Sequence, residues 1–109
     1  MTLTTAVREW QLEVTATARP EGIRLRGEAD IFTLPTLEIA LEMLVGRAND
    51  ATVDLRELTF IDVIGLRALA RAAIHLRSRG RCLRLSGASR QIRRVLGLLG
   101  WAELFEFPC

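Results

Sequence analysis

The side chains that most often do chemistry in proteins are scarce in this chain of 109 residues. It contains one histidine, His75, and two cysteines, Cys82 and Cys109, which are not arranged in a CxxC motif. His75 falls in a predicted helix beside Ile74 and Leu76, and neither a carboxylate nor a thiol stands within one helical turn of it. A metal site needs more ligands than these residues supply. The sequence therefore predicts no catalytic residue, no metal site, no cofactor and two unpaired thiols.

Two aspartates and the arginines are the remaining candidates for chemistry. Asp62 stands directly before a helical pattern, where aspartate is a favoured N-cap, so we expect it to cap that helix rather than act as a base. Asp54 alternates with apolar neighbours and is expected as a charge on the polar face of a sheet. All fifteen basic residues are arginines. A chain without lysine has neither a Walker A loop nor a Schiff base, so enzymes that depend on them are excluded.

The stretch that joins a strand to a helix near the middle of the chain is the most informative. Residues 53–55 alternate as a strand does, and a tight apolar loop with Asp62-Val63-Ile64-Gly65 at its centre follows. Apolar residues then recur at the spacing of one helix face, at Leu66, Leu69, Ala70, Ala73 and Leu76. Gly80 is the predicted C-cap. Because free amide groups gather at a helix N-terminus, we expect the functional point at this loop.

The other elements must hold that loop in place. A hairpin is predicted over residues 12–26, with turn residues at 19–22, after a loose lead-in over residues 1–9. Thr33 is the expected N-cap of a helix that has Pro35 in its first turn and ends near residues 47–49. A strand over 81–86 precedes a helix that is capped by Ser89 and stopped by Gly100, with Ile92, Val95, Leu96 and Leu99 facing inward. Residues 102–107 form a final turn or strand.

The predicted strands share a polar face, which decides the architecture. Apolar and polar residues alternate in each strand, whereas a sheet covered on both sides would show continuous apolar strands. We therefore expect an α/β fold with the order β-β-α-β-α-β-α, a mixed sheet, an N-terminal β-hairpin and three main helices largely on one face. With 109 residues the chain has the length of one domain.

A family resemblance rests on these residues. The central stretch, VDLRELTFIDVIGLRAL, is similar to the signature of STAS domains, the fold of anti-sigma-factor antagonists. Further similarities, in matching order, are GEAD at 27–30, GRCLRL at 80–85, RRVLGLLG at 93–100 and LF at 104–105. The resemblance covers residues from about 10 to 107 and implies a single STAS domain over 1–109 that works by binding proteins.

One departure from the family bears directly on function. STAS antagonists usually carry Asp-Ser-Ser-Gly or Asp-Ser-Thr-Gly where this chain has Asp62-Val63-Ile64-Gly65, and the serine matching Val63 accepts phosphate from a partner kinase. Val63 and Ile64 have no hydroxyl. The resemblance thus implies a non-phosphorylatable, constitutive antagonist or scaffold, a pseudo-antagonist, or a STAS subunit of a lipid or anion transporter. In the alternative interpretation, Val63 or Ile64 merely fills the core beneath the helix.

The resemblance also implies the partners and the residues that meet them. The expected partner is an anti-sigma factor or a serine kinase of the histidine-kinase-like ATPase type, with transporter subunits as the alternative, and a homodimer stays open. The partner-binding residues are expected in the 30–33 loop, the 62–65 loop and the start of the following helix. They are Asp30, Thr33, Asp62, Val63, Ile64, Gly65, Arg67 and Arg71.

Charge and hydropathy bear on whether the chain binds nucleic acid or enters a membrane. The net charge of +2 hides an acidic part over residues 1–62 and a basic part over residues 63–109. No turn-helix signature or aromatic platform accompanies the arginines, so we do not expect nucleic-acid binding. The apolar runs are too short to cross a membrane, and the chain does not begin with a basic segment followed by an apolar block. The sequence therefore predicts no membrane insertion and a cytoplasmic location.

Overall fold

The structure is a computed structural model that describes residues 11–108, so the predicted lead-in over 1–9 and Cys109 lie outside the described residues. Its elements follow the predicted order, and the final turn or strand predicted over residues 102–107 is a 3-10 turn followed by a short strand. They are β1 Leu12–Ala18, β2 Glu21–Ala29, α2 Leu34–Arg47, β3 Ala51–Ile61, α3 Val63–Arg77, β4 Leu83–Ser86, α4 Arg90–Leu98, the 3-10 turn η1 Ala102–Leu104 and β5 Phe105–Glu106.

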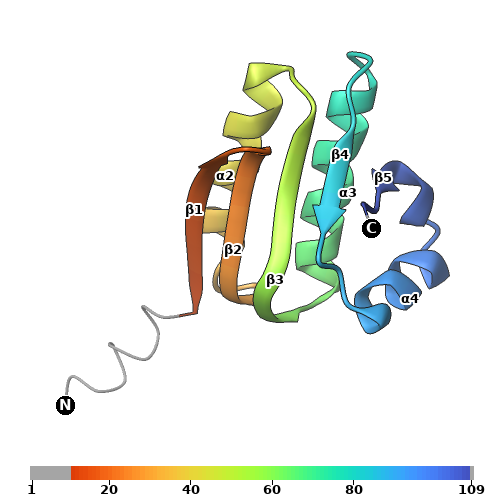
Figure 1. Cartoon of the computed structure of the whole chain (residues 1–109). Coiled ribbons are helices and arrows are strands. Elements are labelled where there is room, and N and C mark those ends of the chain that lie inside the picture. Colours follow the sequence, from red (N-terminus) through yellow and green to blue (C-terminus); the bar gives the residue numbers. More distant parts are fainter. Residues whose placement is uncertain (1–10, 109) are drawn as a thin grey trace.

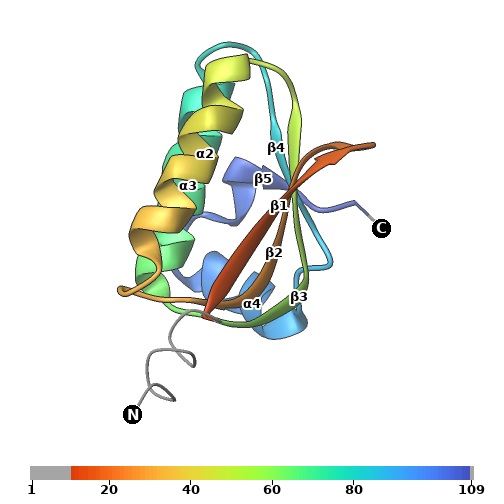
Figure 2. The same cartoon turned by 90° about the vertical axis from the view of Figure 1, so that its left-hand side faces the viewer.

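The five strands form one mixed sheet in the order β1-β2-β3-β4-β5 (Figure 1). β1 and β2 form the predicted antiparallel hairpin, and the remaining neighbours are parallel. Figure 2 shows α2 and α3 side by side on one face of the sheet, with α4 near its lower end. The predictions of a mixed sheet, an N-terminal hairpin and helices largely on one face are confirmed.

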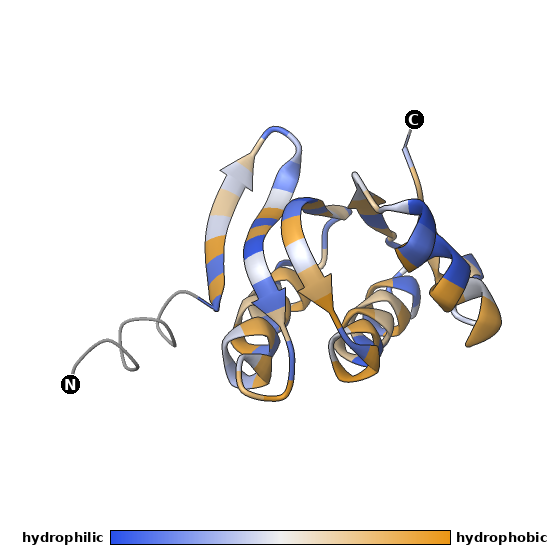
Figure 3. Cartoon of the chain, turned by 90° about the horizontal axis from the view of Figure 1, so that it is seen from below, coloured by the Kyte–Doolittle hydropathy of each residue, from blue (hydrophilic) through white to orange (hydrophobic). Residues whose placement is uncertain are grey.

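The core lies between the sheet and these helices. Alternate residues of β2, β3 and β4 point into it, among them Leu25, Val53 and Leu85, and α2 and α3 contribute Leu37 and Leu69. Each fully buried side chain of this kind stabilises the fold by roughly 1.5–3 kcal/mol. Alternating hydrophobic and hydrophilic bands are visible along β1 and β2 in Figure 3. The period-two pattern in the sequence therefore reports a sheet with one covered face and one open face.

Ion pairs within and between strands lie on the open face of the sheet. Asp54 Oδ2 lies 2.8 Å from the Arg56 Nη2 atom and 3.5 Å from Arg24 Nε. Towards the two edges, Arg26 pairs with Glu13 at 3.7 Å and Arg84 with Glu106 at 3.0 Å. Asp54 stands on the polar face as predicted, but only 8% of it is exposed because the two arginine side chains lie over it.

The long β3 strand departs most from the sequence prediction. A strand around residues 53–55 followed by a loop was expected, whereas β3 continues to Ile61. Its pairing with β2 reaches Ala29 opposite Ile61 and includes register shifts between Arg24 and Arg26 and between Gly27 and Glu28. These irregularities break the simple alternation of buried and exposed residues. The expectation of a loop before Asp62 was therefore wrong.

Helix ends agree with the sequence at some positions and differ at others. Ser89 caps α4 as predicted, since its Oγ accepts a hydrogen bond from the Ile92 amide at 3.1 Å. Thr33 occupies the N-cap position of α2, but its side chain makes no capping hydrogen bond. α3 ends at Arg77, and Gly80, expected as its C-cap, adopts a φ of +73° in the turn just beyond it. Leu99, expected to face inward, is 37% exposed because α4 ends one residue earlier.

Candidate functional site

Three strand-to-helix connections meet at one end of the molecule. Residues 30–33, Asp62 and residues 87–89 follow β2, β3 and β4, which are parallel, so the carboxyl ends of these strands lie at the same edge of the sheet. This edge is the lower end in Figure 1. The amide of Asp62 donates a hydrogen bond to the Ala29 carbonyl at 3.1 Å, which ties the first two connections together. We call this region the loop end.

Asp62 and Gly65 shape the start of α3. The Asp62 side chain accepts a hydrogen bond from the Gly65 amide at 2.9 Å, which confirms that Asp62 is the N-cap. Gly65 is buried against the end of β3. A Cβ atom there would lie 2.8 Å from Ile61 Cγ1 and 3.3 Å from the Cβ of Ala29, so the helix could not approach the sheet as closely. Both residues position the loop rather than offer a reactive group.

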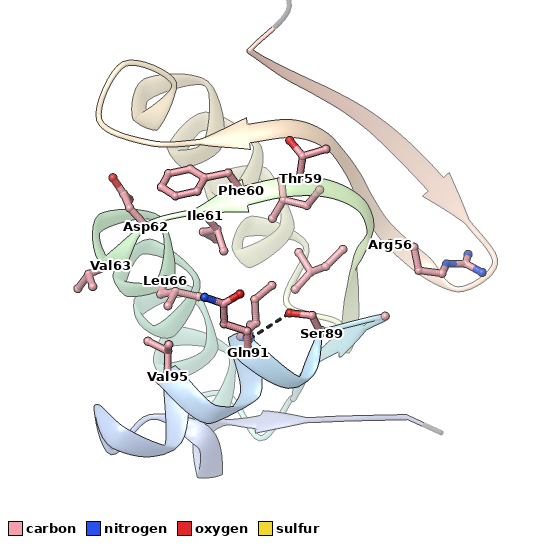
Figure 4. Close-up of a pocket in the computed structure, with 14 residues that line it drawn as sticks. Arg56, Thr59, Phe60, Ile61, Asp62, Val63, Leu66, Ser89, Gln91 and Val95 are labelled. Atoms are coloured by element: carbon pink, nitrogen blue, oxygen red, sulfur yellow. Dashed lines mark hydrogen bonds between the residues drawn. The ribbon is translucent and has the colours of Figure 1, made fainter.

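Val63 and Ile64 follow the cap in the first turn of α3. Val63 is 51% exposed, while Ile64 is partly buried. Figure 4 shows Val63 at the outer surface of the helix start. The alternative in which Val63 fills the core beneath the helix is therefore wrong. Val63, the first residue of α3, presents an apolar surface to solvent.

The 30–33 loop is held by its own side chains. Asp30 Oδ1 accepts hydrogen bonds from the amides of Phe32 at 2.9 Å and Thr33 at 3.1 Å. The buried Thr33 Oγ1 accepts from the Asp30 amide at 2.9 Å and donates to the Glu28 carbonyl at 3.0 Å. Such local bonds fix a turn. Asp30 and Thr33, which were predicted to bind a partner, thus position the loop in this structure, and contact with a partner stays a prediction for both.

Apolar side chains at the loop end were missed by the sequence reasoning. Ile31, Phe32 and Phe60 are exposed large hydrophobic residues, as is Val63. We call these four residues the loop-end patch. Ile31 and Phe32 come between a strand and a helix and belong to the apolar stripe of neither, which is the signal that could have revealed them. Exposed apolar residues that gather in this way are typical of protein-binding surfaces.

A groove of about 530 Å³ lies beside the loop-end patch (Figure 4). It lies between the end of β3, the first turns of α3 and the first turns of α4, and Phe60 and Val63 belong to both the patch and the groove. Most of its lining is apolar, with polar groups from a few residues. The apolar lining residues are Leu55, Leu58, Phe60, Ile61, Val63, Leu66, Ile92 and Val95.

Two exposed arginines extend the surface along α3. Arg67 and Arg71 follow Val63 at intervals of one helical turn, so the three side chains lie along one side of the helix. Among the described residues, neither arginine has a carboxylate oxygen within 4.0 Å. Arg71 also lines a second groove, between α2 and α3, together with Glu38 and Glu42. The structure thus brings Arg67 next to Val63, while Arg71 lies nearer to α2.

The remaining candidates for chemistry are dispersed. His75 is exposed on α3 and lines the α2–α3 groove. Burial raises the pKa of the Cys82 thiol above its usual value, which disfavours the reactive thiolate. Within residues 11–108, no group of three or more His, Cys, Asp or Glu residues could hold a metal ion. No helix in the same range is long and apolar enough to cross a membrane.

The chain is similar in sequence to one protein family and in fold to several solved structures. A family model described as "Mlab, STAS domain" matches residues 12–106. Among curated proteins, none matches the chain in sequence. An anti-sigma factor antagonist from Mycobacterium paratuberculosis superposes with a TM-score of 0.70 at 24% identity, covering 88% of this chain and 82% of that one.

SpoIIAA, an anti-sigma factor antagonist, is similar in two structures. Its unphosphorylated form gives a TM-score of 0.68 at 15% identity, covering 90% of this chain and 87% of that one. The phosphorylated form, from Bacillus, gives a TM-score of 0.65 at 16% identity, covering 90% and 91%. At these identities the similarity concerns the fold. The predicted α/β fold of anti-sigma antagonists is confirmed.

Proposed function

The chain belongs to the STAS domain family, and we propose that it is a non-enzymatic regulatory module that binds a partner protein through the loop end. It resembles anti-sigma-factor antagonists and acts as a single domain with its core at about residues 10–107. The loop-end patch and the adjoining groove form the docking surface. Asp30, Thr33, Asp62 and Gly65 hold the two connections in the required shape.

The observation that carries this proposal is the exposed Val63. In the antagonists that this chain resembles, the matching serine accepts phosphate. A phosphate group of about −2 charge at that point would convert a neutral docking surface into an anionic one and weaken a close interface. Val63 cannot undergo this change. The apolar docking surface is therefore present at all times, and the module binds its partner constitutively.

Three hydroxyl groups near the loop end form hydrogen bonds within the fold. Thr59, three residues before the cap, donates a hydrogen bond through Oγ1 to the Gly27 carbonyl at 2.9 Å. The Thr33 hydroxyl is buried and bonded within its loop. Ser89 caps α4. Each of these hydroxyls is engaged in holding the fold, which supports the proposal that the phosphorylation switch has been lost.

The proposed partner is an anti-sigma factor or a serine kinase of the histidine-kinase-like ATPase type. Arg67 and Arg71 flank the docking surface, and neither has a carboxylate oxygen within 4.0 Å among the described residues, so they suit an acidic or mixed partner surface. Capture from native cell extract followed by mass spectrometry tests this assignment. Recovery of a small kinase-type ATPase or another anti-sigma factor is expected. Recovery of a permease with its ATPase would instead assign the chain to a transporter.

Loss of the switch is tested by incubation with ATP and an anti-sigma kinase from a related system. The wild-type chain is expected to remain unmodified by mass spectrometry, whereas Val63→Ser restores a hydroxyl at the start of α3 and should gain one phosphate at position 63. Val63→Ala is the matched control, because it shortens the side chain without adding a hydroxyl. Phosphate on the wild-type chain at Thr59 or another hydroxyl would overturn the proposal.

A further inference from the structure

The first strand leaves one edge of the sheet unpaired in the described chain. β1 pairs only with β2, and its seven residues keep one register from Leu12 opposite Gly27 to Ala18 opposite Glu21. It forms the left edge of the sheet in Figure 1. At the opposite edge, β5 has only two residues. The two edges therefore differ in length, and only β1 offers a regular ladder of backbone groups.

The pairing of β1 with β2 shows which backbone groups remain free. Glu28 donates its amide to the Gln11 carbonyl, so Gln11 and Glu28 form a hydrogen-bonded pair. In an antiparallel ladder such pairs alternate with pairs that are not hydrogen-bonded to each other. The odd-numbered residues of β1 therefore bond to β2. Leu12, Val14, Ala16 and Ala18 direct their amide and carbonyl groups towards the open edge.

The features that usually protect an exposed edge are missing from β1. Proteins block such edges with lysine, proline, a bulge or an inward-pointing charge. β1 has the sequence LEVTATA, without lysine or proline, and its pairing shows no register shift. Its one charged residue, Glu13, lies 3.7 Å from Arg26 of β2, on the open face of the sheet. Within residues 11–108, no strand pairs with the outer edge of β1, so this edge can accept another strand of similar length.

We propose that β1 pairs antiparallel with β1 of a second copy of this chain, around a twofold axis at Thr15. Val14 then lies opposite Ala16 of the second copy and forms a hydrogen-bonded pair with it, which uses the free groups of both strands. Glu13 lies opposite Thr17, so no like charges meet. The result is a continuous sheet with both sets of helices on the same face.

Helix α2 supplies a second observation at the same edge. Glu38 and Glu42 lie on the side of α2 that faces α3, where they line the groove between the two helices. The opposite side of α2, about half a helical turn away, therefore faces β1. Ile39 and Met43 lie on the outer and β1-facing sides of α2 and are largely exposed. In the dimer this apolar flank faces its equivalent across the twofold axis. Because β5 is too short to add strands, the assembly closes at two copies.

Sedimentation velocity over a concentration series reaching about 1 mM tests the dimer. The wild-type chain should show twice its monomer mass of 12.2 kDa. Ala16→Pro removes an amide that points to the open edge and leaves the β1–β2 ladder intact, so it should sediment as a folded monomer. Ala16→Val keeps the amide and should remain dimeric, which makes it the matched control.

A second variant keeps the dimer testable if the proline variant does not fold. Ala16→Lys places a charge on an exposed position of the edge and should also yield a monomer with an unchanged circular dichroism spectrum. Val63→Asp, at the loop end, should leave the dimer intact, which separates this proposal from the proposed function. A monomeric wild-type chain across the series, or a dimer that persists in Ala16→Lys, would overturn it.

Discussion

The open face of the sheet and the loop end differ in whether their surface side chains have partners within the described chain. On the open face, Asp54 is enclosed by Arg24 and Arg56, and charges on neighbouring strands form pairs within the chain. At the loop end, Val63 presents half of its apolar surface to solvent, and Arg67 has no described carboxylate within 4.0 Å. Charge alone does not mark a binding surface, because the more highly charged face satisfies its charges internally.

The contrast predicts that substitutions differ in how much they destabilise the fold. The largest losses are expected for side chains that are buried in the core. Leu69 is fully buried in α3, the same helix that carries Val63. Leu69→Ala should lower the free energy of unfolding by roughly 2–5 kcal/mol, and Leu41→Ala by a similar amount, because each leaves a cavity in the core. Chemical denaturation measures both. A larger loss for Arg24→Ala, on the open face, would contradict the assignment of the two faces.

Asp54 tests whether the open face is stabilised by its own ion pairs. Its hydrogen bonds from Arg56 hold the pKa of the carboxyl at about 2, below the ordinary value of 3.8. A carboxyl with a lowered pKa in the folded state stabilises the fold above its unfolded pKa, and this contribution is lost as the pH falls towards the folded pKa. Stability should therefore decline between about pH 4 and pH 2.

The Asp54→Asn variant isolates this contribution. At neutral pH it should lose roughly 1–2 kcal/mol, because solvent around the exposed Arg56 screens part of the interaction. The part of the acid-induced decline that belongs to Asp54 should also disappear. Thermal unfolding at a series of pH values measures both effects. An unchanged pH dependence in the variant would show that the pair does not stabilise the open face.

Asp62 is the residue of the loop end that should matter for stability. Its carboxylate accepts a hydrogen bond from the Gly65 amide, and loss of an N-cap usually costs about 0.5–2 kcal/mol. Asp62→Ala should therefore destabilise the chain within that range, while Asp62→Asn, which keeps the acceptor oxygen, should lose less. Equal losses in the two variants, measured by denaturant unfolding, would argue against the capping role.

Val63→Ser should have the smallest effect. Because half of the Val63 side chain is exposed, the serine hydroxyl remains solvated or bonds to free amides at the helix start. The free energy of unfolding should change by less than about 0.5 kcal/mol, as for other surface substitutions. A loss of roughly 1–3 kcal/mol would instead indicate a buried, unsatisfied hydroxyl and would return Val63 to the core.

Local signals explain how much of the fold the sequence could predict. Asp62 and Ser89 were identified as caps because a cap depends on a few adjacent residues. The length of β3 was missed because Arg56 and Glu57 are both exposed, and two consecutive exposed residues interrupt the period of two. That irregularity arises from pairing with β2, which is distant in sequence. Local patterns do not contain this information.

The candidate site was predicted in position and only partly in detail. The place of Val63 at the start of α3 followed from the cap, but its exposure depends on how the helix sits on the sheet. Thr33 was predicted as a cap, whereas its hydroxyl bonds to Glu28 and Asp30 because the loop folds back on the end of β2. The exposed Phe60 was missed for the same reason as the length of β3.

Binding of the captured partner to the purified chain tests the central claim most directly. Val63→Asp and Ile74→Asp place the same charge on the same helix at residues that are each 51% exposed, one at the loop end and one away from it. By titration calorimetry, Val63→Asp should weaken binding about 100-fold, since a carboxylate would be buried against an apolar surface. Ile74→Asp should bind as the wild type does. Equal affinities for Val63→Asp and the wild type would contradict the assignment of the docking surface to the loop end.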